Sequence, residues 1–99
     1  MVEVVTRFKV LPIRCPAHLA LVRSWGCCVP FCTRCPIHAH HVTTVGAGGG
    51  DDATVGLCWW HHAQWHRLGR RTWADLHGLD LVAIAGWNAF HSRYLGVLK

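Results

Sequence analysis

The sequence predicts a small α+β domain in which a β-hairpin and the helix after it form the centre, with further helices on either side. We expect a single domain over 1–99, because 99 residues allow only one, and 52% hydrophobic residues exclude a disordered chain. An alternating apolar pattern near the middle predicts the hairpin, and apolar residues at helical spacing predict the helices. No apolar run reaches the ~20 residues of a membrane helix, so we expect no membrane contact.

The first part of the chain, residues 1–26, is predicted to be an arm followed by a helix. The segment Met1–Arg14 carries several charges and lacks the small-residue cleavage site of a secretory signal, so we expect a cytoplasmic protein. Pro16 suits the first position of a helix, and Gly26 marks its end. The buried stripe of this helix is expected to comprise Leu19, Val22 and Trp25.

The middle of the chain is predicted to be the hairpin and its helix. Ile37–Thr44 alternates well enough for a first strand, and Thr54–Leu57 can return as the second. The glycine-rich loop between them, Val45–Asp52, lacks the Gly-Lys-Ser/Thr of a phosphate-binding loop and is not a nucleotide site. Trp59–Leu68 is predicted to be a helix that ends at Gly69.

Residues 67–99 are expected to supply C-terminal helices. Thr72–His77 is predicted to be a helix stopped by Gly78, and Asp80–Tyr94 a helix with its first residue as N-cap. Their apolar residues are expected to cover the core, namely Leu79, Val82, Ala83, Trp87 and Phe90. Of the six tryptophans, we expect Trp25, Trp73 and Trp87 inside, and base stacking stays open for Trp59, Trp60 and Trp65.

A net charge of +5 and a pI near 9.2 favour a polyanionic partner such as DNA. Three arginines at and just past the end of the central helix could contact a nucleic-acid backbone or simply form a solvated face: Arg67, Arg70 and Arg71.

Cysteine and histidine are concentrated in one region. Five of the six cysteines and six of the nine histidines lie within residues 27–66. This clustering favours metal binding over disulfides, because disulfide frameworks do not need interleaved imidazoles. Cys27 and Cys32, with Cys58 and His61, have the spacing of a tetrahedral structural zinc site. Cys28 or Cys35 could replace Cys27, and spacing leaves that choice open.

Four of the histidines outside the zinc site form a second pattern. His40 and His41 end the first strand, whereas His62 and His66, four residues apart, share one helix face. They suggest a divalent-metal site with one imidazole to spare. Adjacent strand residues point to opposite faces, so His40 and His41 should differ in role. One would ligate the ion, and the other would accept a proton from water.

Between Cys27 and His66 the chain resembles the HNH, or His-Me finger, endonucleases, whose ββα-metal motif is a hairpin and helix around one catalytic ion. The flanks are similar to phage and prophage members. The matching segments are the knuckle Cys-Cys-Val-Pro-Phe-Cys, the strand Ala39–Val42, Asp52 in the loop, and Leu57–His66.

The resemblance implies a metal-dependent endonuclease that hydrolyses DNA phosphodiester bonds. It implies that His41 is the general base and that Asp52 lies near the position that orients it. The catalytic ion, Mg²⁺, Mn²⁺, Ni²⁺ or Zn²⁺, would be bound by His40, His62 and His66. The structural zinc would be bound by Cys27, Cys32, Cys58 and His61. The alternative is a non-catalytic zinc module that binds nucleic acid or protein, which would not need these additional histidines.

Overall fold

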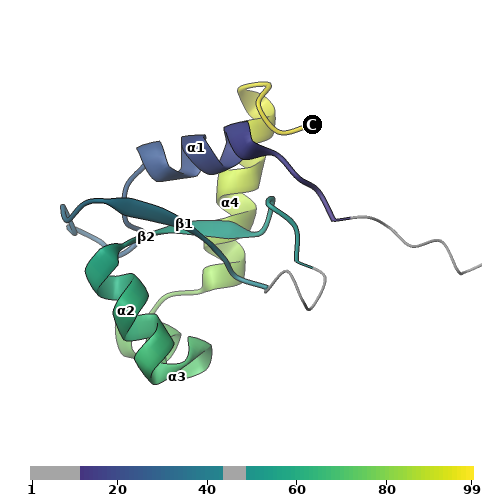
Figure 1. Ribbon diagram of the computed structural model, residues 1–99. Helices are drawn as coiled ribbons and strands as arrows, with labels where there is room; N and C mark the ends of the chain where they lie inside the picture. The colour runs from purple at the N-terminus through teal and green to yellow at the C-terminus, as the bar shows by residue number, and fades with distance from the viewer. Residues whose placement is uncertain (1–11, 44–48) are drawn as a thin grey trace, which may run out of the picture.

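The computed structural model describes residues 12–43 and 49–99 and confirms the α+β class. The elements follow in the order α1 (Pro16–Ser24), β1 (Ile37–His41), β2 (Thr54–Cys58), α2 (Trp59–Leu68), α3 (Arg70–His77) and α4 (Leu81–Tyr94) (Figure 1). Two predicted segments lie outside the described residues: residues 1–11 of the arm, and residues 44–48, which cover the end of the predicted first strand and the first half of the glycine-rich loop. Within the described part, no helix combines the length and apolar character needed to cross a membrane.

The hairpin is the centre of the fold. β1 and β2 pair antiparallel, with Ile37 opposite Cys58 and His41 opposite Thr54. Every residue of β2 is buried, because α1 and α2 lie at the two sides of the hairpin and α4 runs behind it (Figure 1). β1 ends at His41, earlier than predicted, because its partner strand begins at Thr54; beyond it, Val42 adds one more backbone hydrogen bond, to Ala53 (2.8 Å).

The turn before β1, which we call the knuckle (residues 27–32), is seated directly on β2. The backbone N–H of Cys28 donates to the carbonyl oxygen of Gly56 over 2.8 Å. A side chain at Gly56 would collide with the carbonyl oxygen of Gly26. Glycine is therefore required in the middle of this strand, and the close approach brings Cys27 beside the end of β2.

The helix boundaries match the capping residues. α2 spans the predicted Trp59–Leu68, and Asp80 caps α4 by accepting a hydrogen bond from the backbone N–H of Ala83 at 3.0 Å. α3 begins at Arg70, earlier than predicted. The core formed between these elements comprises Val42, Val55, Leu57, Trp65, Trp73, Leu81 and Ala85.

The inner face of α4 differs from the prediction. Its buried residues are Leu81, Ala85, Ala89 and Ser92. Val82, Trp87 and Phe90 are instead 61–64% exposed, Ala83 is also exposed, and Trp25, the residue after α1, is 42% exposed, so their predicted burial was wrong. α4 carries apolar side chains on all of its faces, so hydrophobicity alone did not identify the inner one. The small side chains of Ala85 and Ala89 let the helix approach β2 closely.

Candidate metal centre and the adjoining histidine

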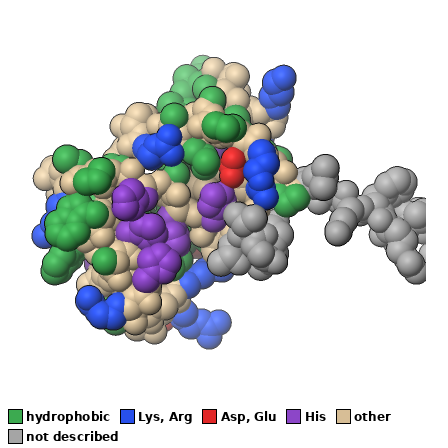
Figure 2. All heavy atoms as spheres, in the orientation of Figure 1, with side chains coloured by type: hydrophobic (Ala, Val, Ile, Leu, Met, Phe, Trp, Pro, Cys, Tyr) green, Lys and Arg blue, Asp and Glu red, His purple; other side chains and the backbone are tan. Residues whose placement is uncertain are grey.

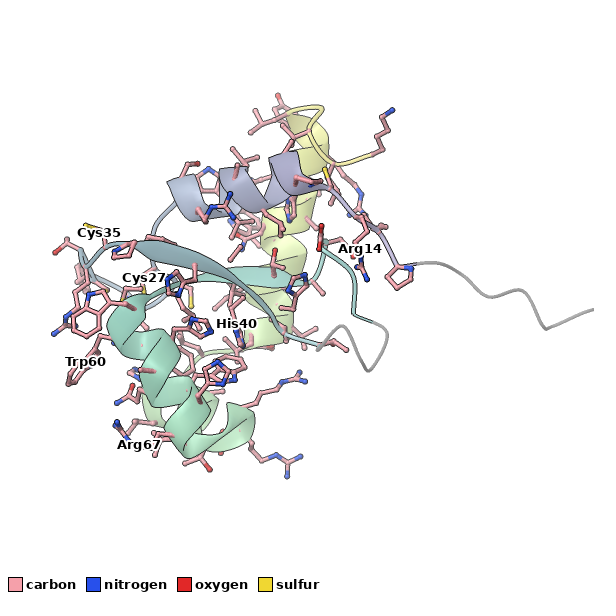
Figure 3. All side chains as sticks on the ribbon, viewed as in Figure 1. Arg14, Cys27, Cys35, His40, Trp60 and Arg67 are labelled. Carbon is pink, nitrogen blue, oxygen red and sulfur yellow. The ribbon has the colours of Figure 1, made fainter. Side chains whose placement is uncertain are left out.

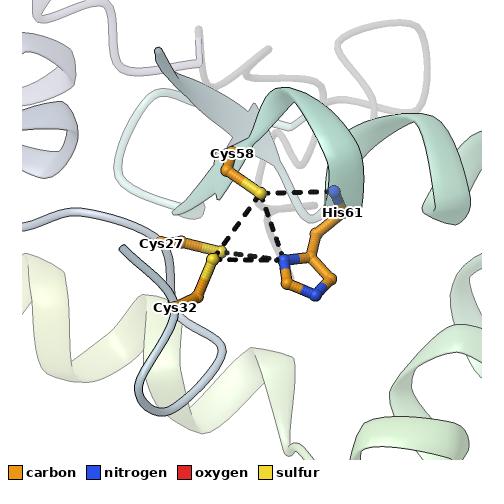
Figure 4. A group of neighbouring side chains, drawn as sticks. All are labelled: Cys27, Cys32, Cys58 and His61. Atoms are coloured by element: carbon orange, nitrogen blue, oxygen red, sulfur yellow. Dashed lines mark hydrogen bonds between the residues drawn. The ribbon is translucent and has the colours of Figure 1, made fainter. Parts of the chain in front are cut away.

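One cysteine from each side of the knuckle meets the start of α2. The Sγ atoms of three cysteines and a ring nitrogen of one histidine all lie within 4.8 Å of one another: Cys27, Cys32, Cys58 and His61 (Figure 4). Cys28 and Cys35, the alternatives left open by spacing, are not in this group. We call it the Cys3His group.

The Cys3His group has the dimensions of a tetrahedral zinc site. Zn–S bonds of about 2.3 Å place two sulfur atoms roughly 3.8 Å apart, and the Sγ atoms of Cys32 and Cys58 lie 3.7 Å apart. Nδ1 of His61 lies 3.1 Å from Cys58, 3.4 Å from Cys27 and 3.5 Å from Cys32. These residues can therefore hold a metal ion.

Local structure fixes these ligands. Cys58 is the N-cap of α2, and its Sγ accepts a hydrogen bond from the backbone N–H of His61 at 3.3 Å. The knuckle is closed by a hydrogen bond from the N–H of Cys32 to the carbonyl of Val29 at 3.1 Å. Burial raises the pKa of Cys27 to about 11. That thiol ligates only when a cation displaces its proton, which couples metal binding to pH.

A second group of histidines lies between β1 and α2, and we call it the histidine group: His40, His62 and His66. Nε2 of His62 lies 3.1 Å from both Nδ1 of His40 and Nε2 of His66. Burial, reinforced by the neighbouring histidines, lowers the pKa of His40 to about 4. Burial also lowers the pKa of His62. Both shifts favour the neutral ring, the form that ligates metals. Figure 2 shows histidine side chains gathered on this face.

Sequence reasoning missed His38. Its Nδ1 lies 2.7 Å from Nδ1 of His62, so the ring of His62 contacts His38 through one nitrogen and the histidine group through the other. Residues two apart on a strand share a face, so the spacing of His38 and His40 was the signal that could have found it. A partner on the second ring nitrogen fixes the orientation of a metal-binding histidine.

His41 contacts a different partner from His40, as expected for adjacent strand residues. Its Nε2 lies 2.8 Å from Oδ1 of Asp51, whose side chain is only 7% exposed. The resemblance had pointed to Asp52 instead. In the structure the carboxylate that contacts His41 is Asp51, one position earlier, because the turn after Gly50 directs Asp51 toward β1, whereas Asp52 lines a separate hollow beside α4.

The histidine group and His41 lie beside one surface hollow of about 340 Å³. Its lining comprises His40, His41, Val42, Thr43, Trp65, His66 and Arg70. Of the three arginines singled out from the sequence, Arg70 reaches this hollow. Arg67 is exposed on α2. Arg71 does not line this hollow; with Arg70 it lines another one, beside Asp75 and Asp80.

Comparisons of the chain with models of known protein families, with curated proteins and with solved structures found no match. The chemistry of the site therefore rests on its own residues. They provide a sulfur-rich group and a nitrogen-only group that could each hold a metal ion, and a carboxylate-bound histidine, the last two beside one open hollow.

Proposed function

We propose that this protein is a metal-dependent DNA endonuclease of the HNH type. The observation that carries the proposal is the single hollow lined by His41, by two members of the histidine group and by Arg70. Phosphodiester hydrolysis needs a base for water, a cation near the phosphate and a positive group that binds the backbone. The hollow offers one candidate for each.

His41 is the proposed general base. Asp51 engages Nε2 at 2.8 Å, and no other described residue hydrogen-bonds to Nδ1, which can therefore accept a proton from water. Asp51 is itself held by the backbone N–H of Cys15, which donates to Oδ2 at 2.7 Å. The ring is therefore braced from the segment before α1, and such bracing positions a base before substrate arrives.

The two metal groups have different proposed tasks. A divalent ion at the histidine group would offset the charge that develops on the phosphate and on the departing oxygen. Zinc at the Cys3His group would stabilise the fold by joining the knuckle to α2. Cys58 and His61 are buried, whereas His66 is exposed beside the hollow, which agrees with a structural and a catalytic task respectively.

The charge pattern favours a nucleic-acid substrate. The sequence has no aspartate or glutamate over 12–50 or 53–74, and these segments contain six arginines. Arg70 begins α3 at the edge of the hollow, where its guanidinium group can meet a phosphate.

The non-catalytic zinc module is the competing function. It accounts for the Cys3His group but gives no role to the histidine group or to the pair of His41 and Asp51. Incubation of the zinc-loaded protein with supercoiled plasmid and Mg²⁺, Mn²⁺, Ni²⁺ or Zn²⁺ distinguishes the two. We expect nicked or linear DNA with at least one of these ions. A chelator that removes only the weakly bound ion should leave the plasmid uncut. Intact plasmid under every condition would contradict the nuclease.

A further inference from the structure

Three exposed aromatic side chains flank the ligands of the Cys3His group. Phe31 directly precedes Cys32, and Trp59 and Trp60 directly follow Cys58. Phe31 is 101% exposed, Trp59 48% and Trp60 45%. We call Phe31, Trp59 and Trp60 the aromatic surface. Trp59 and Trp60 contact each other edge to face, with ring centroids 5.9 Å apart, but none of the three belongs to the hydrophobic core of the described residues.

The Cys3His group brings the aromatic surface together from two segments. Since the Sγ atoms of Cys32 and Cys58 lie 3.7 Å apart, standard chain dimensions place the Cα atoms of Phe31 and Trp59 within about 17 Å of each other. The guanidinium carbon of Arg34 lies 5.2 Å from the ring centroid of Trp60, a cation–π contact that joins the segment after the knuckle to α2.

The backbone holds Phe31 outward. Its φ of 65° lies in the left-handed region, which residues other than glycine seldom adopt. In this conformation the side chain stands free at the tip of the knuckle, between exposed Pro30 and the half-buried Cys32. A strained, fully exposed phenylalanine is consistent with a ring that is used on a partner.

The surroundings of the aromatic surface indicate the chemistry of that partner. Arg34 stacks on Trp60, and Arg67 lies seven residues after Trp60 on the same face of α2 (Figure 3). No acidic residue occurs in the two segments that build this region. Aromatic rings interleaved with arginine, without acids, are typical of surfaces that bind single-stranded nucleic acid by base stacking.

We propose that the aromatic surface stacks on unpaired bases of a single DNA strand. A duplex presents only base edges in its grooves, so exposed ring faces gain little from it. His62 and His66 follow Trp59 by three and seven residues on α2, so the three side chains share one face of the helix. A strand stacked on Trp59 therefore leads toward the hollow. This direction rests on the proposed function, whereas the stacking itself does not.

The test is a binding measurement that needs no cleavage. The full-length, zinc-loaded protein is titrated without added divalent ions against a fluorescent oligothymidine strand, a strand of equal length made of abasic sites, and a duplex. We expect the base-containing strand to bind about fivefold or more tightly than the abasic strand, which has the same phosphate charge. Phe31→Ala and Trp60→Ala should each reduce this ratio severalfold.

Phe90→Ala is the matched control, because Phe90 is 61% exposed on α4 and lies outside the aromatic surface. It should leave the ratio unchanged, and zinc content should stay at the wild-type value in all three variants. Equal binding of base-containing and abasic strands by the wild type would overturn the proposal. So would a shift from dimer to monomer in Phe31→Ala without a change in the ratio, since the surface would then join two copies of the chain. Because the readout is binding, an inactive protein can still pass this test.

Discussion

Nε2 of His41 lies 2.8 Å from Oδ1 of the buried Asp51. Burial alone would raise the pKa of Asp51, but hydrogen bonds from His41 and from the backbone N–H of Cys15 outweigh it and hold the pKa below its ordinary value. Asp51 is therefore ionised at neutral pH and fixes the end of β1 to the segment before α1. Asp51 therefore orients His41, the proposed base, and the backbone N–H of Cys15 orients Asp51.

Asp51→Asn should lower the rate of DNA cleavage about tenfold or more, because an amide orients the ring of His41 less firmly than a carboxylate does. Asp52→Asn is the matched control, one residue along and lining another hollow. Its cleavage rate should stay within about twofold of wild type. Single-turnover rates on plasmid DNA measure both variants, and a larger loss in Asp52→Asn would return the positioning role to the residue that the resemblance implied.

Cys58→Ser should abolish folding or leave the protein insoluble. Structural zinc contributes on the order of 10 kcal/mol to folding in small zinc domains, which is comparable with the whole stability of a domain this size. Cys35→Ser, at an exposed cysteine outside the Cys3His group, should keep one zinc per chain and its melting temperature. Elemental analysis and thermal melts compare the two. A folded, zinc-bound Cys58→Ser would show that the ligand set is wrong.

His66→Ala should separate the two metal groups. His66 is exposed and belongs to the histidine group, so its loss should leave one tightly bound zinc and a near-native melting temperature. Metal-stimulated cleavage should fall by ~10²-fold, since the ion would lose one of its three protein ligands. Loss of the tight zinc in this variant would instead indicate one site of mixed ligands.

Arg70→Ala should weaken DNA binding about equally for all sequences and reduce the salt slope by roughly one unit, as expected for one phosphate contact. Arg71→Ala is the control, because both arginines line the hollow beside Asp75 and Asp80, but only Arg70 also lines the hollow of His41. Fluorescence anisotropy at several salt concentrations gives both slopes. Equal slopes for the two variants would assign Arg70 to the solvated surface.

Local signals in the sequence predicted most of the fold. Gly69 and Asp80 mark helix ends through backbone conformation and capping, which depend on neighbouring residues only, so α2 and the start of α4 were predicted closely. The inner face of α4 depends on what packs against it. Because Trp87 and Phe90 are as apolar as the residues that are buried, the sequence favoured the wrong side.

The candidate site also has features that depend on local sequence and features that depend on tertiary packing. Ligand types and the i, i+4 spacing of His62 and His66 are local, and the structure brings these residues together as expected. The partner of His41 is not local, because Asp51 and Asp52 differ only in how the turn before β2 directs their side chains. Spacing also left the choice among Cys27, Cys28 and Cys35 open, because their reach to Cys58 depends on how the knuckle sits on β2.

The most direct test of the proposed nuclease is the single-turnover cleavage rate of supercoiled plasmid by wild type and by His41→Ala, each carrying one zinc and supplied with the most effective divalent ion. We expect a loss of 10²-fold or more in His41→Ala, the usual effect of removing a positioned acid–base group, with zinc content and DNA affinity retained. Equal cleavage rates for the two proteins would contradict the assignment of His41 as the base and, with it, the proposed enzyme.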